Sequence, residues 1–183
     1  MLNDVITPCK VKLIPADIKS KPVIKNLARF YVYELSRYSG EDIPESGLFE
    51  ADEASFHYDH YWNKPGYYPF IIRVDNQLAG FVLINKKGSS KKVNWHLVEF
   101  YILASFQNKG IGRQIALQLL NQFPGLWEIA QMPNNLPAIH FWRSVIQKFT
   151  NGQYTEAKKR IRNPHPHEMI IQQFTSPMLF TKP

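Results

Sequence analysis

Two glycines in one short turn carry the clearest chemical signal in this chain. Gly110 and Gly112 lack a Cβ atom, so the backbone N–H groups around them can approach an anion closely. The turn follows an apolar run at residues 98–103, typical of a buried strand, and precedes apolar residues at helical spacing from Ile111 to Phe123. The first N–H groups of a helix have no partner within it, and the helix dipole favours negative charge there. The sequence therefore predicts an anion-binding turn between a strand and a helix.

The spacing around these glycines distinguishes three kinds of phosphate-binding turn. A P-loop needs Gly-x-x-x-x-Gly-Lys-Ser/Thr, a run that the chain does not contain. A dinucleotide-binding turn needs a third small residue where Ile115 stands. The pattern Gln/Arg-x-x-Gly-x-Gly/Ala is matched by Gln107, Gly110 and Gly112. In this acyl-CoA motif the chain resembles the GNAT superfamily of acyl-CoA-dependent N-acyltransferases. An ordinary turn between a strand and a helix is the alternative.

The resemblance implies that acetyl-CoA is the co-substrate, and it places the residues that bind it. Backbone N–H groups from Asn108 to Gly112 would bind the pyrophosphate, and Arg113 would add positive charge. The pantetheine arm would lie along the preceding strand, where one backbone amide would be the oxyanion donor. The cofactor-binding residues implied in this way are Tyr101, Ile102, Leu103, Gln107, Asn108, Lys109, Gly110, Ile111, Gly112, Arg113, Asn135 and Trp142.

Asn135 and Trp142 belong to a second motif. Residues 135–142 resemble the GNAT pattern Asn-x-x-Ala-x-x-Phe-Tyr, which implies that Asn135 bonds the pantetheine arm. The tyrosine that usually protonates the leaving thiolate is Trp142 here, and an indole N–H does not give up its proton near neutral pH. Tyr101, Tyr154 and His140 are candidate replacements, and a thiolate could also leave unprotonated. Residues 26–36 and 127–156 resemble one branch of predicted GNAT acetyltransferases, so the tryptophan fits a branch pattern.

Glu99 is the candidate catalytic base. It is the only carboxylate between Asp75 and Glu128, and it stands in an otherwise apolar strand. Burial in such a strand raises the pKa of a carboxyl group, which suits a base that works near neutral pH. The family resemblance implies that it acts through a water molecule. The structural alternative is that Glu99 pairs with a neighbouring lysine or with His96.

Hydrophobic periodicity predicts the elements that hold these residues. Strands are expected at 10–14, 67–74, 77–85, 93–103, 127–132, 154–157 and 168–174, and helices at about 20–40, 111–123 and 133–149, with a further short helix within 39–66. This order resembles the GNAT arrangement along the whole chain. We therefore expect a mixed α/β (α+β) GNAT-like fold, with a central, mostly antiparallel twisted sheet of about seven strands and helices on both faces.

Length and composition narrow the class of protein. A chain of 183 residues with 44% hydrophobic and 14% aromatic residues predicts a single domain over residues 1–183. No apolar run approaches the roughly 18 residues of a membrane span, and no signal peptide or metal-binding spacing of cysteines and histidines is visible. Cys9 is the single cysteine, so we expect a cytoplasmic protein without an internal disulfide. The sequence leaves a homodimer open.

Charge is distributed unevenly along the chain. The net charge is +7, yet residues 39–66 hold seven carboxylates against one lysine, which gives that segment −6 and the rest +13. The basic runs at 86–92 and 158–162 fall in expected turns, which weighs against a nucleic-acid partner. The acidic segment, with Tyr58, Tyr61 and Trp62, would attract a cationic acceptor, unless it is only a solvated loop.

The sequence thus predicts an N-acetyltransferase that moves an acetyl group from acetyl-CoA to a primary amine, such as a cationic small molecule. A CoA-sensing protein without turnover is the second hypothesis, because Trp142 replaces the usual acid. A basic RNA-associated module is the third.

Overall fold

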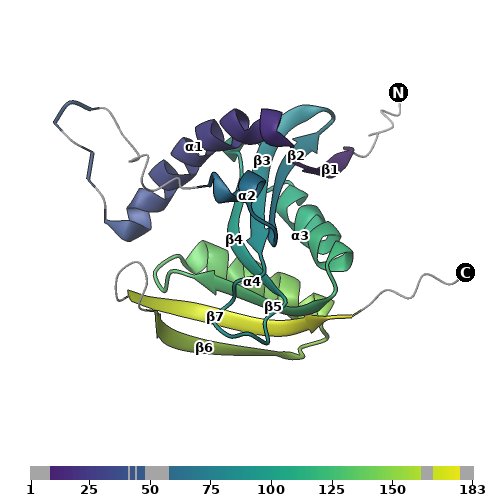
Figure 1. The fold of residues 1–183 in the computed structure, drawn as a ribbon. Coiled ribbons are helices and arrows are strands. Elements are labelled where there is room, and N and C mark those ends of the chain that lie inside the picture. Colours follow the sequence, from purple (N-terminus) through teal and green to yellow (C-terminus); the bar gives the residue numbers. More distant parts are fainter. Residues whose placement is uncertain (1–8, 41, 44, 48–57, 162–166, 178–183) are drawn as a thin grey trace, which may run out of the picture.

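One seven-stranded sheet organises the molecule, in the order β1-β2-β3-β4-β5-β7-β6 (Figure 1). The computed structural model describes residues 9–40, 42–43, 45–47, 58–161 and 167–177. The strands are β1 Val11–Pro15, β2 Tyr67–Val74, β3 Gln77–Asn85, β4 Trp95–Ile102, β5 Gly125–Gln131, β6 Tyr154–Ile161 and β7 His167–Ser176. The helices are α1 Lys21–Ser39, α2 His60–Asn63, α3 Ile111–Gln122 and α4 Leu136–Phe149, with 3-10 turns η1 Ile18–Ser20 and η3 Ala104–Phe106. Only β4 and β5 are parallel among the described pairs. The expected mixed α/β fold is confirmed.

Local sequence signals set the boundaries of these elements. Asp75 and Asn76 both have positive φ, 48° and 69°, which is the two-residue hairpin turn that joins β2 to β3. Pro22 occupies the first turn of α1, and Gly40 ends the helix in the left-handed region at φ 76°. None of the helices in the described ranges is long and apolar enough to cross a membrane.

The central feature for function is the separation of β4 from β5. These strands pair only over residues 95–97 and 127–129. The register between β3 and β4 shifts at the same place, because Leu83 pairs with Glu99 and Ile84 with Leu97, which leaves Val98 as an extra residue. Such a bulge bends a strand and increases its twist. β4 therefore turns away from β5 after residue 97, and the ribbon divides into two halves there (Figure 1).

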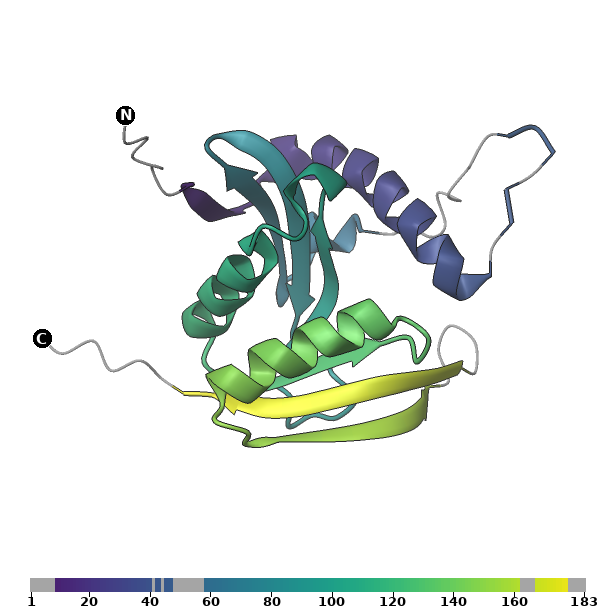
Figure 2. The same ribbon diagram turned by 180° about the vertical axis from the view of Figure 1, so that it is seen from behind.

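Two hydrophobic cores lie on opposite faces of the sheet. α3 and α4 pack with one set of strand residues, which includes Leu97 and Trp127, while α1 and α2 pack with another set on the other face, which includes Phe81 and Tyr101 (Figures 1 and 2). β3 and β4 approach so closely that a Cβ atom on Gly80 would lie 2.0 Å from the carbonyl oxygen of Tyr101. Glycine at residue 80 is therefore required for this contact.

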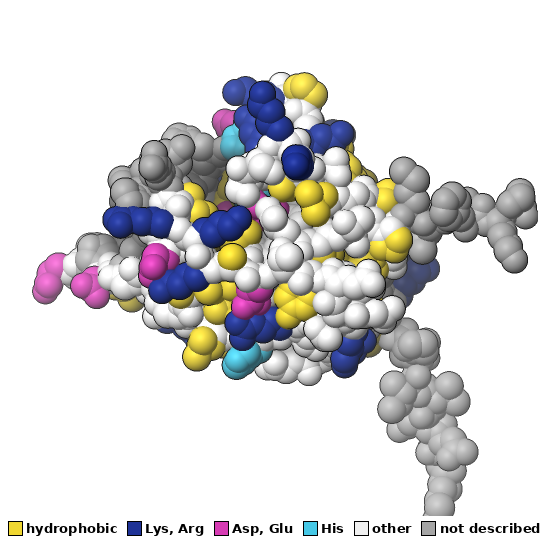
Figure 3. Space-filling view, turned by 90° about the horizontal axis from the view of Figure 1, so that it is seen from below, with side chains coloured by type: hydrophobic (Ala, Val, Ile, Leu, Met, Phe, Trp, Pro, Cys, Tyr) yellow, Lys and Arg dark blue, Asp and Glu magenta, His cyan; other side chains and the backbone are white. Residues whose placement is uncertain are grey.

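Two sequence expectations are corrected at the edge of the sheet. β6 runs to Ile161 instead of ending at 157, so Lys158, Lys159 and Arg160 lie in a strand and not in a turn. Residues 154–161 are mostly exposed, which explains why their pattern did not show a core-facing alternation. On the face that carries β6 and β7, basic side chains are scattered among acidic and polar ones and do not form one continuous patch (Figure 3).

Candidate active site

The glycine turn presents unpaired backbone N–H groups at the start of α3. Asn108 and Gly110 have φ values of 58° and 75°, and Gly110 is the residue before the helix. Because Gly110 has no side chain, it cannot cap the helix, and the first helical bond runs from the N–H of Gln114 to the carbonyl of Gly110. No hydrogen bond among the described residues uses the N–H groups of residues 111–113. The start of α3 therefore has free donors for an anion.

The surroundings of the turn fit a phosphate group. The first turn of α3 contains no acidic residue, and Arg113 and Lys109 are exposed. The Lys109 ammonium donates to the carbonyl of Ser105 over 2.8 Å. A Cβ atom added at Gly110 would meet nothing within 4 Å, whereas one at Gly112 would lie 3.4 Å from the Phe141 ring. Gly110 thus keeps the approach to the N–H groups open, and Gly112 allows α3 to pack near α4.

Gln107 joins the turn to β4 and to α1. Its side-chain amide donates to the carbonyl of Ile102 over 2.8 Å and to the carboxylate of Glu34 over 3.3 Å. Glu34 lies on α1 and also accepts the hydroxyl of Tyr101 over 2.8 Å. Sequence reasoning missed Glu34, because a glutamate within an amphipathic helix carries no signal for a partner 67 residues away.

The end of β4 offers fewer free backbone groups than the sequence predicts. Leu103 uses its N–H to bond the carbonyl of Ala79 and its carbonyl to accept the N–H of Phe106, both at 2.8 Å. The carbonyl of Tyr101 faces Gly80 on β3. Because successive N–H groups of a strand point to opposite sides, the N–H of Ile102 points away from β3, toward the side that β5 has left. Ile102 is therefore the best placed of the three for a ligand.

Glu99 lies half-buried on β4, two residues past the last pair with β5. The Tyr58 hydroxyl donates to its carboxylate over 3.1 Å, and the Tyr31 hydroxyl adds a second hydrogen bond. Burial raises the pKa of Glu99 to about 7, although the two phenols oppose this shift. No described lysine forms a salt bridge with Glu99. The carboxyl group therefore changes its charge near neutral pH.

The second motif is divided between a helix cap and the core. Asn135 caps α4, since its side-chain oxygen accepts the N–H of Ala138 over 3.2 Å. Trp142 is 4% exposed and packs edge-on against Phe100, with ring centroids 5.1 Å apart. Its ring is thus part of the core between α4 and β4.

The three candidate proton donors lie in different surroundings. The Tyr101 hydroxyl donates to Glu34, and burial together with this carboxylate raises its pKa. Tyr154 packs against the core at the start of β6, and His140 is exposed on α4. No described contact brings any of these three side chains to Glu99.

Four of the seven carboxylates of the acidic segment lie outside the described residues: Glu41, Glu50, Asp52 and Glu53. Asp42 and Glu45 are exposed. Asp59 pairs with Lys21 and Lys25 of α1, over 2.9 and 3.5 Å, so its charge is balanced by that helix. Tyr58 and Tyr61 are buried beside α1, and the Trp62 indole donates to the backbone carbonyls of Ala16 and Asp17. The expected short helix is α2.

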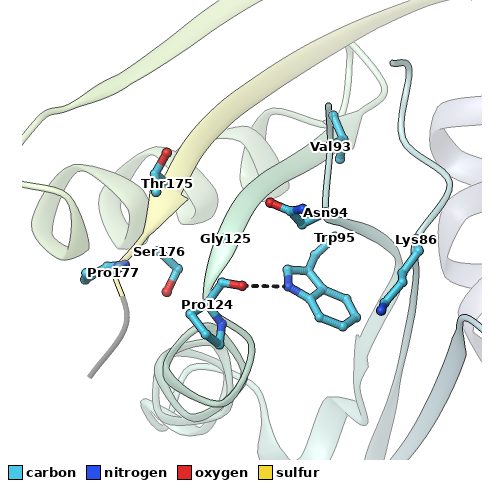
Figure 4. A pocket seen from close by; sticks show the side chains of 9 residues that line it. All are labelled: Lys86, Val93, Asn94, Trp95, Pro124, Gly125, Thr175, Ser176 and Pro177. Carbon is cyan, nitrogen blue, oxygen red and sulfur yellow. Dashed lines mark hydrogen bonds between the residues drawn. The ribbon is translucent and has the colours of Figure 1, made fainter. Parts of the chain in front are cut away.

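A separate pocket of about 530 Å³ lies at the opposite end of β4 from the glycine turn (Figure 4). Trp95 forms one wall and donates its indole N–H to the carbonyl of Pro124 over 3.0 Å, and the Lys86 ammonium lies 5.0 Å from the centre of the Trp95 ring. No residue that the sequence singles out for acetyl-CoA lines this pocket.

Comparison with known proteins agrees with this geometry. The chain matches the acetyltransferase (GNAT) family over residues 32–145, which is more than half of its length. No curated protein sequence matches it. An acetyltransferase from Thermus thermophilus superposes with a TM-score of 0.59 and 14% identity, covering 90% of this chain and 97% of that one.

Two further solved structures are acetyltransferases of ribosomal proteins. An enzyme from Salmonella typhimurium, which modifies the N-terminal serine of L7/L12, has a TM-score of 0.59 and 15% identity over 92% of this chain and 96% of that one. The ribosomal-protein-S18-alanine N-acetyltransferase of Escherichia coli has a TM-score of 0.56 and 14% identity over 95% and 99%. At these identities the superpositions show the shared fold. The match to the family model shows more: the chain belongs to the GNAT acetyltransferase family.

Proposed function

We propose that this protein transfers an acetyl group from acetyl-CoA to a primary amine, with Glu99 as the general base. The observation that carries the proposal is the position of Glu99. Its titrating carboxyl group stands on the part of β4 that has left β5, at the same end of the strand as the unpaired N–H groups of α3. Tyr58 and Tyr31 bond Glu99 on the α1 face of the sheet, whereas α3 packs on the other face, so a thioester held at the start of α3 would reach Glu99 through the separation of β4 and β5.

The chain's own groups supply three parts of the reaction. The N–H groups of residues 111–113 would hold the pyrophosphate, and Gln107 would fix the turn against β4. Glu99 would take a proton from the acceptor ammonium through a water molecule, so that the neutral nitrogen can attack the thioester carbon. The N–H of Ile102 would stabilise the oxyanion, the carbon–sulfur bond would then break, and the second proton of the attacking nitrogen would pass to the solvent. A CoA thiol with a pKa close to that of cysteine, about 8.5, can leave as thiolate without a tyrosine at residue 142.

We propose that the acceptor is a cationic primary amine. As the sequence predicts, this amine would be a small molecule. The charge of −6 on residues 39–66 supports a cation, and Tyr58 links the end of this segment directly to Glu99. Two superposed structures are acetyltransferases of ribosomal proteins, and one of them modifies an N-terminal serine, so peptide N-termini belong in the same test. The single cysteine supports a cytoplasmic location.

The test is release of free thiol from acetyl-CoA in the presence of amine panels. Polyamines, aminoglycosides, lysine-like amines, neutral amines and peptides with free N-termini form the arms. The proposal expects turnover with a cationic amine, a rate that falls as ionic strength rises, and a mass increase of one acetyl group on the acceptor. Tight CoA binding without turnover on any amine would instead support the CoA-sensing hypothesis.

A further inference from the structure

A buried side chain at the end of β5 has a hydrogen-bonding atom without a partner. Gln131 is 5% exposed, and its side-chain oxygen has no hydrogen bond among the described residues. A buried polar atom without a partner is costly, so native proteins retain few of them. The unpartnered side-chain oxygen of Gln131 is therefore a candidate acceptor for a hydrogen bond from a ligand.

A chain of hydrogen bonds fixes which atom of Gln131 is left over. Arg143 of α4 can only donate, and it bonds the carboxylate of Glu156 on β6 over 2.9 Å. The Glu156 carboxylate also accepts the side-chain amide of Gln172 over 2.8 Å. The oxygen of Gln172 in turn accepts the amide of Gln131 over 3.3 Å. The direction of every bond is thus set by the guanidinium at one end, and an acceptor oxygen is presented at the other.

Gln131 lies on the part of β5 that no longer pairs with β4. Ile129 is the last residue of β5 that pairs with β4, and Gln131 follows two residues later. Side chains two apart on a strand share a face, so Gln131 lies on the α4 side together with Trp127 and Ile129. Asn135, the cap of α4, comes four residues further along the chain. Gln131 therefore lies on β5 two residues beyond its last pair with β4, on the face that α4 covers.

We infer that the side-chain oxygen of Gln131 accepts a hydrogen bond from an amide N–H of the pantetheine arm of the acyl donor. The inference rests on the proposed function, since it requires that acyl-CoA lies between β4 and β5. The arm carries two secondary amides. A fixed acceptor on β5 would bond one of these amides, while the backbone of β4 would bond the opposite side of the arm. Gln131 would thus be a positioning residue, with Arg143, Glu156 and Gln172 setting its orientation.

A binding cycle by calorimetry tests this. The variant is Gln131→Met, and the ligands are CoA and two CoA analogues in which one or the other pantetheine amide N–H is replaced by an ester oxygen. We expect Gln131→Met to weaken CoA binding about tenfold and one ester analogue to weaken binding to the unaltered protein by a similar factor. The variant should bind that analogue as tightly as it binds CoA, because the hydrogen bond is already absent. With the other analogue, the loss of affinity from the substitution and the loss from the ester should add.

A control ligand, 3′,5′-ADP, separates a direct contact from damage to the fold. The nucleotide 3′,5′-ADP lacks the pantetheine arm, so its affinity should be the same for both proteins. Equal losses for 3′,5′-ADP and CoA, or additive losses with both ester analogues, would overturn the inference while leaving the proposed function intact. Failure of the unaltered protein to bind CoA would overturn both.

If Gln131→Met does not fold, the unaltered protein still decides the question. The side-chain carbonyl carbon of Gln131 should shift in the NMR spectrum on addition of CoA, but not of 3′,5′-ADP. No shift with CoA would reject the contact.

Discussion

Two glutamates on neighbouring strands, the buried Glu128 and the half-buried Glu99, have pKa values that are shifted in opposite directions. Glu128 of β5 is 3% exposed and accepts the N–H of Ser89 over 2.8 Å, the Ser89 hydroxyl, and the Gln173 amide over 2.7 Å. Burial raises its pKa, but these hydrogen bonds and His96 together lower the pKa below the ordinary value. Among the described residues, Glu99 of β4 accepts hydrogen bonds only from phenol hydroxyls, and burial raises its pKa to about 7.

The difference follows from where each carboxylate stands relative to the separation of β4 and β5. Glu128 lies where the strands pair, opposite His96, so the connection from β3 to β4 and strand β7 can supply donors. Glu99 lies two residues beyond the last pair, where no backbone donor is bonded to it in the described chain. A fully bonded carboxylate stays ionised and holds structure, whereas a sparsely bonded one can exchange a proton.

The largest expected effect is on catalysis. Glu99→Gln should lower kcat by roughly 10²–10⁴-fold, the usual effect of removing a positioned base, and leave CoA affinity unchanged. The matched variant Glu128→Gln should retain most of kcat. Thiol release and CoA calorimetry on both proteins measure this. Equal loss of kcat in both variants would remove the distinction between the two carboxylates.

The next effect concerns the anion site. Gly110→Val should weaken acetyl-CoA binding by on the order of 100-fold, because a β-branched residue is strained at φ 75° and would obstruct the N–H groups of α3. Gly40→Val is the matched control, since Gly40 has nearly the same φ, 76°, and equally open surroundings at the end of α1. Both variants should lose similar stability by thermal denaturation. Retained affinity in Gly110→Val would mean that acetyl-CoA does not bind there.

Glu99 and Glu128 should also change the free energy of unfolding in opposite directions as pH rises. A raised folded-state pKa means that the native protein binds more protons than the unfolded chain between about pH 4.5 and 7, so Glu99 lowers the free energy of unfolding as pH rises through this window. Glu99→Gln should remove up to roughly 3 kcal/mol of this decline.

Glu128 should contribute in the other direction. Its lowered pKa stabilises the native state above the unfolded pKa, and this contribution is lost as pH falls through the folded pKa. Glu128→Gln should therefore destabilise at pH 7 by about 1–3 kcal/mol and less in acid. Urea unfolding at pH 4, 5.5, 7 and 8 compares the two variants, and the same sign for both would contradict the account.

The smallest expected effect is on the pH dependence of kcat/KM, and it comes from the tyrosine hydroxyl that bonds Glu99. Tyr58→Phe removes a donor that favours the ionised carboxylate, so the pH at which kcat/KM rises should move up by about one unit. Tyr61→Phe is the control, because the Tyr61 hydroxyl has no hydrogen bond to Glu99. The pH dependence of kcat/KM measures both, and an unchanged profile in Tyr58→Phe would show that this hydroxyl does not influence the base.

Local patterns were sufficient to predict most of the fold and the start of α3 at the glycine turn. Glycine spacing located the start of α3, and periodicity located the strands, because both depend on neighbouring residues. The exposed strand β6 was predicted too short, since charged residues without a buried face show no alternation.

The partners of the site residues could not be predicted in this way. Glu34 reaches Tyr101 and Gln107 across 67 and 73 positions, and Tyr58 reaches Glu99 across 41. Such contacts arise only when α1 and α2 pack on the sheet. The bulge at Val98, which separates β4 from β5, likewise depends on register with β3 and not on a local signal.

Direct titration of the two carboxyl groups tests the central claim most closely. Carbon NMR of the side-chain carboxyl carbons, assigned with Glu99→Gln and Glu128→Gln, follows each group from pH 3 to pH 9. The account predicts that Glu99 changes its charge near pH 7 and that Glu128 does so below its ordinary value. A Glu99 that titrates at or below the ordinary glutamate range, about 4.3, would be ionised throughout, and its assignment as the base tuned by burial would be contradicted.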